Sequence, residues 1–538
     1  MDATSGNGHG GGPRVRAPVN HWIVALTVSM ATFMEVLDTS IANVVLPYIS
    51  GGLAVGRSQA TWVLTSYLVA NAIVLPLSGW LMGLLGRKRF YMTCVLLFTI
   101  SSALCGAAPN IELLILFRVL QGLGGGGLQP SEQGILIDAF PRQQLGMAMA
   151  LYGMAVVVAP ILGPVLGGFI SDNYSWRWIF YINVPVGIVS LVLTNIIVRD
   201  PPGMDEQVRG NRLRGLNIDY IGLALVSLGL GSLEVLYAKG QEWDWFGDPF
   251  WRAQTFFATT VVGLGAFIVW ELRHPNPMIN LRLLGERNFL ACGLIIYIGF
   301  AVLYGVNVAT PQMLQELFGY DAFHAGLVLS PASVFTMGIM PVAGFLMGKK
   351  VDARSIVPLG LICLAGGAYW QAHLNLDASP YTLIAPRCVQ MLGVGLLFVP
   401  LNNAAYLYLP GHQVNNAAGL FNMLRNEGGS LGIAIVDVLV DRRGQFHQLR
   451  LAEHVTPMNP AVDRWIQYFA QTRMTHGGVT RAVAEQQGMG LLSRMVHNQA
   501  REMAYLDPLW VFAIMGLAAL PLILLMKKVV AKGGVAMH

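Results

Sequence analysis

The chain has 538 residues, of which 54% are hydrophobic and 12% are charged, and its formal net charge is +5. A soluble domain carries about 25% charged residues, so this composition excludes an ordinary soluble protein, and the modest positive charge gives no reason to expect nucleic-acid binding. Apolar runs of about 20 residues, the length that a helix needs to cross a bilayer, recur along the chain. Since alternating ten-residue strands are absent, we predict an all-α polytopic membrane protein.

The first 20 residues, MDATSGNGHGGGPRVRAPVN, are rich in glycine and in polar side chains. They lack the apolar core and the small-residue cleavage site of a signal peptide, so we interpret residues 1–20 as a disordered cytoplasmic tail. The five cysteines include no C-x-x-C pair, and no two histidines are spaced as H-x-x-x-H. The sequence therefore predicts neither a disulfide framework nor a metal site.

Fourteen membrane-spanning helices follow in chain order. They are predicted at residues 21–49, 60–83, 89–109, 111–136, 145–171, 177–198, 219–238, 254–272, 289–312, 323–347, 355–374, 380–405, 414–440 and 507–527. Lys and Arg concentrate in the loops that face the cytoplasm when the N-terminus is placed inside, as the positive-inside rule requires. Both termini are therefore expected in the cytoplasm, and Arg387 is expected near the point where span 12 enters the membrane.

An internal repeat divides the chain. GWLMG at 79–83 closes the second span and GFLMG at 344–348 closes the tenth, each before a basic loop. Spans 9–14 then repeat spans 1–6 in the same orientation, which is a transporter architecture, although a chance match in Gly- and Leu-rich sequence is the alternative. The predicted parts are an N-terminal six-helix half at 21–200, a linker with two extra transmembrane helices at 201–288, a C-terminal six-helix half at 289–527 that includes a long periplasmic loop at 441–505, and a cytoplasmic tail at 528–538.

The stretch MEVLDTSIANVVLP at 34–47 places two acids, Glu35 and Asp38, inside the first span. A charge at the middle of a membrane helix costs roughly 2.5–3.5 kcal/mol on insertion scales, so such residues usually face the protein interior and have partners. Asp38 lies nine residues before the outer end of span 1, and Arg118 lies eight residues after the outer start of span 4. At about 1.5 Å per residue both lie about 12–14 Å below the outer surface, so the two side chains are able to pair.

This pair suggests a mechanism. If a conformational change or the substrate moves Arg118 away, Asp38 is expected to take up a proton, because a nearby guanidinium stabilises the charged form of a carboxyl group. Glu35, on roughly the same helix face, would share that proton or bind a cationic substrate. A static salt bridge that holds two helices together is the alternative.

Span 13 contains three more charged residues, Arg425, Glu427 and Asp437, which join the candidate proton-coupling set. Arg425 and Glu427 are two positions apart and face different sides of a helix, so they need different partners. Glu132 in span 4 and Glu234 in span 7 are weaker candidates, since either could lie near a membrane surface.

Several stretches resemble the major facilitator superfamily, specifically its fourteen-span drug:proton antiporter-2 family of EmrB-type multidrug exporters. They are LDTSIANVVLP (37–47), RVLQG (118–122), APILGPVLGG (159–168), WRWIFYINVPVG (176–187) and PQMLQELFGYDAFHAGL (311–327). The resemblance covers nearly the whole chain. It implies a major facilitator fold of two six-helix halves plus two inserted helices, and it assigns Arg118 to proton coupling.

The span-5 stretch is similar to the antiporter motif of this superfamily, with Ala159 in place of its first glycine. Its other motif residues are Gly163, Pro164, Gly167 and Gly168. Small residues four positions apart let helices approach closely, and the proline bends the helix. By resemblance the motif favours exchange over leak, whereas tight packing without a coupling role is the alternative.

The loop after span 2 departs from the family pattern G-x-L-x-D-R-x-G-R-K. Here it reads GWLMGLLGRK, so Gly83 replaces the acid of the cytoplasmic gate and Leu84 replaces the following arginine. The candidate gate residues are Gly79, Gly83, Gly86, Arg87, Lys88 and Arg89. Whether another residue compensates for the missing acid is left open by the sequence.

The resemblance implies a secondary active transporter and not an enzyme. The predicted function is a proton-coupled antiporter that exports drugs or other amphipathic small molecules across the inner membrane of a Gram-negative bacterium. No G-x-x-x-x-G-K-[ST] motif is present, so ATP is not the expected driving ligand, and no cofactor is expected. Plausible polar anchors for the substrate are Asn43, Gln121, Tyr304, Asn307, Gln312, Asn402 and Asn403.

Two other functions stay open. The first is a dedicated exporter of one metabolite or siderophore with the same mechanism. The second is a transport-dead sensor or assembly scaffold whose outer loop is the working part.

The loop at 441–505 contains two segments with apolar residues at helical spacing, 461–473 and 479–503. Amphipathic helices in that compartment suit a docking partner. In EmrB-type exporters this region resembles the part that faces a periplasmic membrane-fusion adaptor and, through it, an outer-membrane channel. A self-packed cap over the outer mouth is the alternative.

Overall fold

A computed structural model describes residues 20–528, except residues 142–143, 201–205, 207, 211–218, 276, 350, 377, 411–412, 457 and 478. The predicted tail at 1–20 therefore lies outside the described residues except for Asn20, and the tail at 528–538 lies outside them except for Lys528. Across the described part of the chain the secondary structure is helical, and no strand is present.

The first nine helices form one set along the chain. They are α1 (His21–Gly52), α2 (Arg57–Ala60), α3 (Trp62–Leu85), α4 (Arg87–Ala107), α5 (Ile111–Gly125), α6 (Leu128–Ala139), α7 (Leu145–Asn173), α8 (Trp178–Tyr181) and α9 (Asn183–Ile197). Side chains fix where the long helices begin. Asn20 accepts a hydrogen bond from the Trp22 backbone N–H at 3.0 Å, and Asn110 accepts one from Leu113 at 3.0 Å. These N-caps satisfy backbone donors that have no partner within the helix.

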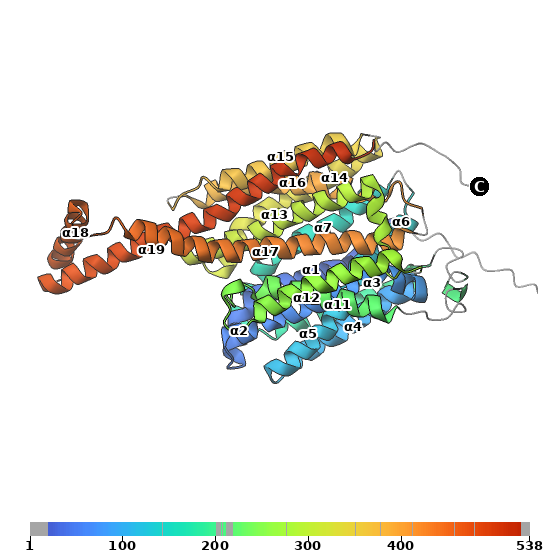
Figure 1. Ribbon diagram of the computed structural model, residues 1–538, viewed down its shortest axis with the longest axis horizontal. Coiled ribbons are helices and arrows are strands. Elements are labelled where there is room, and N and C mark those ends of the chain that lie inside the picture. The colour runs from blue at the N-terminus through green and yellow to red at the C-terminus, as the bar shows by residue number, and fades with distance from the viewer. Residues whose placement is uncertain are drawn as a thin grey trace, which may run out of the picture.

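The later helices include the predicted insertion and the second half. They are α11 (Tyr220–Lys239), η1 (Trp245–Gly247), α12 (Arg252–Arg273), η2 (Leu281–Gly285), α13 (Arg287–Leu317), α14 (Ala322–Gly348), α15 (Ala353–Gln371), α16 (Pro380–Tyr406), α17 (Val414–Ala452), α18 (Pro460–Gly477), α19 (Arg481–Ala518) and η4 (Leu520–Leu525). Figure 1 shows the long helices running side by side along the long axis of the molecule, with α7 and α17 in the middle of the bundle and α18 outside it.

The predicted spans fall on these helices, and the count stays close to the prediction. By length and composition, twelve helices among the described residues can cross a membrane. Helix α7 makes thirteen if its two segments, which meet at an angle of 43° between Pro160 and Leu162, form one span. The remaining predicted span, 414–440, lies in α17. This span carries three ionisable residues, Arg425, Glu427 and Asp437, and α17 is not among the thirteen. A fourteen-span chain is consistent with this arrangement.

Glycines set the closest helix contacts. A Cβ atom at Gly122 would lie 2.5 Å from the Tyr67 carbonyl oxygen of α3, and one at Gly124 would lie 2.7 Å from the Phe98 backbone nitrogen of α4. Only a residue without a side chain allows α5 to lie this close to both helices. The backbone of α5 therefore holds Arg118 deep between its neighbours.

The segment predicted as a long loop at 441–505 begins and ends in helix. Residues 441–452 continue α17, and residues 481–505 belong to α19, so the two helices extend beyond the bundle. Figure 1 shows this extension, with α18 at its tip, on the side away from the C-terminus. The segment 441–452 contains no proline and one glycine, so nothing in it breaks the helix where the apolar sequence stops. The predicted helices at 461–473 and 479–503 correspond to α18 and α19.

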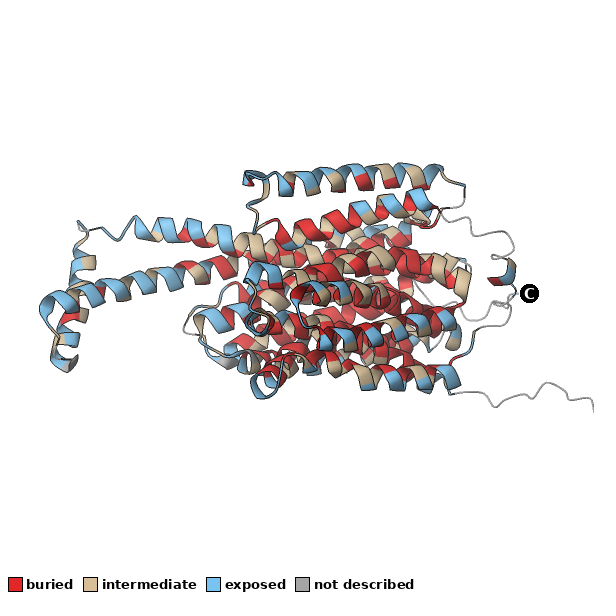
Figure 2. Cartoon of the chain, turned by 90° about the horizontal axis from the view of Figure 1, so that it is seen from below, coloured by how far each residue is buried: buried red, intermediate tan, exposed pale blue. Residues whose placement is uncertain are grey.

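Ion pairs hold the extended helices together. Arg443 and His447 of α17 lie 2.5 and 2.8 Å from the Asp507 carboxylate of α19, and Arg501 of α19 lies 2.8 Å from Glu316 of α13. Most of the remaining surface of the extension is exposed (Figure 2). The extension is therefore braced at its base and free along most of its length.

Candidate proton-coupling site

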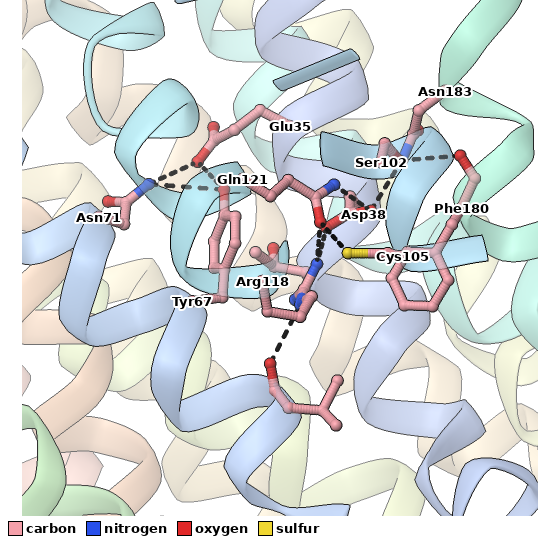
Figure 3. Close-up of polar contacts among 12 residues, drawn as sticks. Glu35, Asp38, Tyr67, Asn71, Ser102, Cys105, Arg118, Gln121, Phe180 and Asn183 are labelled. Carbon is pink, nitrogen blue, oxygen red and sulfur yellow. Dashed lines mark hydrogen bonds and ion pairs between the residues drawn. The ribbon is translucent and has the colours of Figure 1, made fainter. Parts of the chain in front are cut away.

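Asp38 and Arg118 form a buried ion pair between α1 and α5. The Arg118 Nη1 atom lies 2.5 Å from Asp38 Oδ2, and the two residues are 0% and 2% exposed, respectively. Gln121 donates to Asp38 Oδ1 at 3.1 Å, and Asn183 of α9 donates to the same oxygen at 2.8 Å (Figure 3). Three side chains, Arg118, Gln121 and Asn183, therefore donate hydrogen bonds to the two oxygens of this carboxylate.

The guanidinium has further contacts that fix its orientation. Arg118 Nε donates to the Val63 carbonyl oxygen at 3.0 Å, and its Nη1 donates to Gln121 Oε1 at 2.9 Å. The Tyr67 ring centroid lies 4.4 Å from the guanidinium carbon and the Phe180 centroid lies 5.6 Å from it, within the range of cation–π attraction. Among the residues that the structure describes, Arg118 Nη2 has no hydrogen-bond partner. These contacts fix the guanidinium through its Nε and Nη1 groups, while its Nη2 group is left as a donor without an acceptor among the described residues.

Glu35 lies beside this pair and is linked to it through Tyr67. Its Oε1 atom accepts hydrogen bonds from the Tyr67 hydroxyl at 3.1 Å and from Asn71 at 3.2 Å, and its Oε2 accepts one from Gln129 at 2.6 Å. Glu35 is 3% exposed. The same tyrosine ring therefore faces Arg118 while its hydroxyl holds the second acid (Figure 3).

The span-5 motif lies in α7 and packs against α1 at Ser40 and Ile41, two and three residues after Asp38. Ser40 Oγ donates to the Pro160 carbonyl oxygen at 2.8 Å. A Cβ atom at Gly163 would lie 2.1 Å from Ser40 Oγ, and one at Gly167 would lie 3.2 Å from Ile41 Cγ2. The other motif residues Ala159, Pro164 and Gly168 are buried. The motif therefore sets the distance between α7 and the helix that carries both acids.

The span-13 residues have separate surroundings, as their spacing predicts. Arg425 donates to the Tyr152 hydroxyl at 2.6 Å, and its guanidinium carbon lies 5.3 Å from the Phe300 ring centroid. Glu427 is 5% exposed, and its Oε2 has no hydrogen-bond partner in the described part of the chain. Asp437 is half-buried further along α17.

Glu132 and Glu234 do not lie near a surface. Glu132 is fully buried and accepts a hydrogen bond from Ser29 at 2.5 Å, and Glu234 is 3% exposed and accepts one from Ser430 at 2.9 Å. Of the two positions that the sequence left open for each residue, the structure shows the buried one, because α6 and α11 turn these faces toward α1 and α17. Spacing along one helix gave no information about that rotation.

A hydrogen-bond chain that the sequence did not predict connects α6 to the second half. Gln133 donates to Asn402 at 3.0 Å and accepts from Tyr406 and Asn422, each at 2.8 Å. The Tyr152 hydroxyl, which Arg425 contacts, donates to Asn422 at 3.3 Å. The chain therefore leads from Arg425 to the centre of the bundle.

The seven predicted substrate anchors do not form one cluster in the described residues. Gln121 belongs to the Asp38 site and Asn402 to the Gln133 chain. Asn307 contacts Arg387. Tyr304 and Asn403 are half-buried, while Asn43 and Gln312 are exposed.

The predicted gate loop has an acidic partner from another helix. Arg87 is buried, forms an ion pair with Asp138 of α6, and donates to the Gly134 carbonyl oxygen at 2.9 Å. Lys88 is half-buried, and its backbone N–H donates to Asp200 at 2.9 Å. Gly86, with a φ of +86°, makes the turn between α3 and α4. Asp138 thus gives Arg87 a carboxylate partner in a loop where Gly83 stands in place of the family acid.

Gly79 and Arg89, the first and last of the candidate gate residues, differ in their packing. A Cβ atom at Gly79 would lie 2.6 Å from the Asn416 Cα atom of α17, so this glycine allows close contact between the halves. Arg89 is exposed. Arg87 and Asp138 also line a cavity of about 220 Å³ at this end of the bundle.

Arg387, which is expected near the point where span 12 enters the membrane, is 1% exposed and hydrogen-bonded to Asn307 and Gln390. These contacts were not predicted. A signal in the sequence was available: RCVQ at 387–390 repeats the R-x-x-Q spacing of RVLQ at 118–121.

The described residues contain no cluster of His, Cys, Asp or Glu able to hold a metal ion. The arrangement is a helical membrane bundle with a buried acid–guanidinium pair between α1 and α5. The model of the Major Facilitator Superfamily matches residues 28–433, so the chain belongs to that superfamily.

Individual relatives give a closer placement. The chain is 36% identical over 520 residues to the multidrug export protein EmrB of Escherichia coli strain K12, covering 95% of this chain and 96% of that protein. It is 39% identical to EmrB of Haemophilus influenzae, covering 81% and 84%, and 36% identical to the fatty acid resistance protein FarB of Neisseria gonorrhoeae, covering 88% and 92%. The chain is therefore an EmrB-type member of the superfamily, a transporter and not an enzyme.

Solved structures agree on the fold. The proton:xylose symporter XylE matches with a TM-score of 0.56 at 14% identity, covering 93% of this chain and 94% of that one. The human organic anion transporter MFSD10 matches with a TM-score of 0.58 at 12% identity, covering 94% and 100%.

Proposed function

We propose that this protein is a proton-coupled antiporter that exports drugs or other amphipathic small molecules across the bacterial inner membrane. The observation that carries the proposal is the buried Asp38–Arg118 pair at 2.5 Å, in a chain 36–39% identical to multidrug export proteins. A charged carboxylate held by a movable cation is a proton site whose affinity depends on conformation.

The proposed cycle uses competition between a proton and Arg118 for the same carboxylate. While the pair is closed, Asp38 stays ionised. When the halves move and the guanidinium withdraws, the buried charge loses its partner and is neutralised by a proton. Return of Arg118 expels that proton to the other side.

The energy is sufficient without ATP or a cofactor. Inward passage of one proton through 100 mV supplies about 2.3 kcal/mol. At one proton per neutral substrate this supports about a 40-fold concentration gradient. The antiporter motif would prevent proton leak by keeping α7 against α1 while Asp38 carries no proton.

Further residues enter the proposal with defined roles. Glu35, Arg425, Glu427 and Asp437 are proposed to assist proton coupling, and the polar anchors Asn43, Tyr304, Asn307, Gln312, Asn402 and Asn403 to bind substrate in different stages of the cycle. Gln121, by its hydrogen bonds, is better suited to hold Asp38 than to contact substrate.

The proposed architecture has two six-helix halves, at 21–200 and 289–527, with α11 and α12 inserted between them and both termini in the cytoplasm. Its support is the positive-inside pattern, the repeated GWLMG and GFLMG segments and the packing of α11 and α12 against each other and of α11 against α3.

We also propose that the extension formed by 441–505 docks a periplasmic adaptor, which would connect the exporter to an outer-membrane channel. Trp465, Tyr468 and Met489 are exposed on it, and it points away from the bundle instead of folding over its mouth (Figure 1). Replacing 455–500 with a short Gly/Ser linker should abolish adaptor co-purification and leave transport in adaptor-free vesicles close to normal. Equal loss of both would favour a cap.

Reconstitution tests the main proposal. Proteoliposomes with an imposed pH gradient should drive counterflow of an unrelated set of drugs, with proton movement in the opposite direction followed by a pH-sensitive dye. Transport of a single metabolite that no drug inhibits would favour the dedicated exporter, and absence of any proton-coupled flux would favour the scaffold.

A further inference from the structure

Helices α1 and α6 meet through a row of polar side chains in the interior of the first half. Ser29, Thr32 and Glu35 recur every three residues along α1, and Gln129 and Glu132 do so along α6, so each set lies on one face of its helix. All five are buried, and we call them the polar row. Gln129 donates to Glu35 Oε2 at 2.6 Å, and Ser29 donates to Glu132 Oε1 at 2.5 Å. Polar and ionisable groups inside a membrane span are costly and usually mark the path of an ion or a proton.

The acids of the polar row share one cation. Asp38, on the same helix, is already paired with Arg118. Arg425 of α17 is close enough to act on both Glu35 and Glu132, but its guanidinium donates hydrogen bonds to neutral groups, and among the described residues it forms an ion pair with neither acid. A buried carboxylate without a cation of its own is neutralised by a proton. One proton held between Glu35 and Glu132 therefore balances the charge of the row.

Three oxygen atoms of the row have no hydrogen-bond partner within the described residues. They are Thr32 Oγ1, Gln129 Oε1 and Glu132 Oε2. Thr32 lies one helical turn from Glu35 and one turn from Ser29, which holds Glu132, so its hydroxyl stands between the two acids. A hydroxyl group can accept a hydrogen bond from one acid and donate one to the other. With a proton present, the row becomes a set of groups able to pass that proton along α1.

One end of the polar row reaches the Asp38–Arg118 pair. Glu35 precedes Asp38 by three residues, so the two carboxyl groups lie on one face of α1. The Tyr67 hydroxyl donates to Glu35 at 3.1 Å, and the ring of the same tyrosine lies 4.4 Å from the Arg118 guanidinium carbon (Figure 3). When Arg118 returns to Asp38 and displaces its proton, Glu35 is the next acid along α1 toward the N-terminus.

The other end of the row lies about one helical turn from the cavity beside the gate loop. Ile135, three residues after Glu132, and Val24, five residues before Ser29, both line this cavity of about 220 Å³. Its other lining residues include His21 and Asp138, and it has room for several water molecules. A proton on Glu132 therefore has about 5 Å to cover along α6 before it reaches a polar cavity.

The ionisable groups that face Glu132 come from several helices. They are Glu35 of α1, Tyr91 of α4, Tyr152 of α7 and Arg425 of α17. Those that face Glu35 also include Asp38, Tyr67 of α3 and Tyr304 of α13. Arg425 is the cation common to both acids and belongs to the second half, so movement of the two halves changes how strongly it favours their ionised forms.

We propose that Glu35, Thr32 and Glu132 form the route by which the proton leaves Asp38 for the cytoplasm, with Glu132 as the group that releases it. This inference rests on the proposed antiport and adds its proton pathway. The Asp38 carboxyl group gives its proton to the Glu35 carboxylate, while Glu132 gives the proton that the row already held to water in the cavity. Transfer from Glu35 to Glu132 through the Thr32 hydroxyl then restores the starting state, so one proton enters the row and one leaves it.

Infrared spectroscopy tests the shared proton without requiring a drug. Full-length protein in phosphatidylcholine nanodiscs is compared in neutral and alkaline solution, where exposed carboxyl groups are ionised throughout. The difference spectrum should contain the carbonyl band of one buried protonated carboxyl group. Either Glu35→Gln or Glu132→Gln should remove this band, because the acid that remains has Arg425 to itself, and Glu112→Gln, which changes an exposed acid at the start of α5, should leave it in place. Absence of the band in the wild type, or its persistence in both variants of the row, would overturn the inference.

A variant that keeps both acids tests the route itself. Thr32→Val preserves the shape of the side chain but removes the hydroxyl, so drug efflux driven by a pH gradient in proteoliposomes should slow by at least about tenfold, as expected when a proton-transfer group is lost. Thr32→Ser keeps a hydroxyl and should recover most of the rate. Exchange of drug for drug across the membrane moves no proton, so Thr32→Val should reduce it far less than it reduces proton-driven efflux.

The outcomes separate the pathway from the function on which it rests. Equal loss of exchange and of proton-driven efflux in Thr32→Val would show a structural role and overturn the route, as would wild-type efflux by both Thr32→Val and Glu132→Gln. Absence of proton-driven efflux in the wild type would instead contradict the proposed antiport, and the infrared band would still report whether the row holds a proton.

Discussion

Each half of the bundle contains a buried arginine at an equivalent position, but the two guanidinium groups have different partners. Arg118 and Arg387 occupy equivalent positions in α5 and α16, and each contacts the glutamine three residues later. Arg118 is neutralised by Asp38 at 2.5 Å, while Arg387 contacts only amides. Asp38 gives the first guanidinium a carboxylate partner, whereas among the described residues no carboxylate forms an ion pair with the second.

The largest effect is expected from a substitution that changes the Asp38–Arg118 site and leaves Arg387 unchanged. Asp38→Asn keeps the shape of the side chain but removes the group that binds the proton, so proton-driven drug efflux should fall to the level of empty vesicles while membrane insertion survives. The measurement is counterflow in proteoliposomes together with the amount of purified folded protein. Asp463→Asn, an exposed acid on α18, serves as the matched control and should transport normally. Wild-type efflux by Asp38→Asn would refute the coupling role.

The next prediction compares the two arginines directly. Arg118→Gln leaves the Asp38 charge buried without its cation, which should lower the free energy of unfolding by about 3–5 kcal/mol. Arg387→Gln leaves only amides behind, so its loss should be about 1 kcal/mol per hydrogen bond. Denaturant unfolding in detergent gives both values. Adding Asp38→Asn to Arg118→Gln should restore most of the stability, and equal losses for the two single variants would show that the sites do not differ in charge balance.

A smaller effect is expected at the contact that positions Asp38. In Gly163→Ala the new methyl group would overlap Ser40 Oγ, since a Cβ atom there would lie 2.1 Å from it. Such overpacking costs about 1–3 kcal/mol and should separate α7 from α1, so proton leak without drug should rise. Gly338→Ala in α14, where a Cβ atom meets nothing within 4 Å, is the control. If both variants leak equally, the motif has no specific role in coupling.

The height of Asp38 and Arg118 was predictable because helical rise is constant. Counting residues from the ends of two spans was enough to place both side chains at one depth, and the structure records them in contact. The same count places Arg387 near the start of its span but did not predict that neighbouring helices bury it. Distance along a helix gives depth in the bilayer but says nothing of which neighbour covers the residue, and here α13 and α15 do so.

The sequence also did not predict how each helix is rotated about its own axis. Glu132 and Glu234 could not be assigned to surface or interior, and the structure buries both. The loop at 441–505 illustrates a different limit. Hydropathy marks where a span leaves the membrane, but it does not mark where the helix ends, and α17 and α19 continue well beyond the apolar sequence.

By itself the sequence determined the helical membrane class, the approximate spans, the family motifs and the depth of the buried charges, since these depend on composition, periodicity and a fixed rise per residue. The tertiary structure alone decided which groups meet. It paired Arg118 with an acid and Arg387 with an amide, gave Arg87 its partner in Asp138 and joined the halves through Gln133, because contacts between helices depend on their rotation and packing, which no single segment encodes.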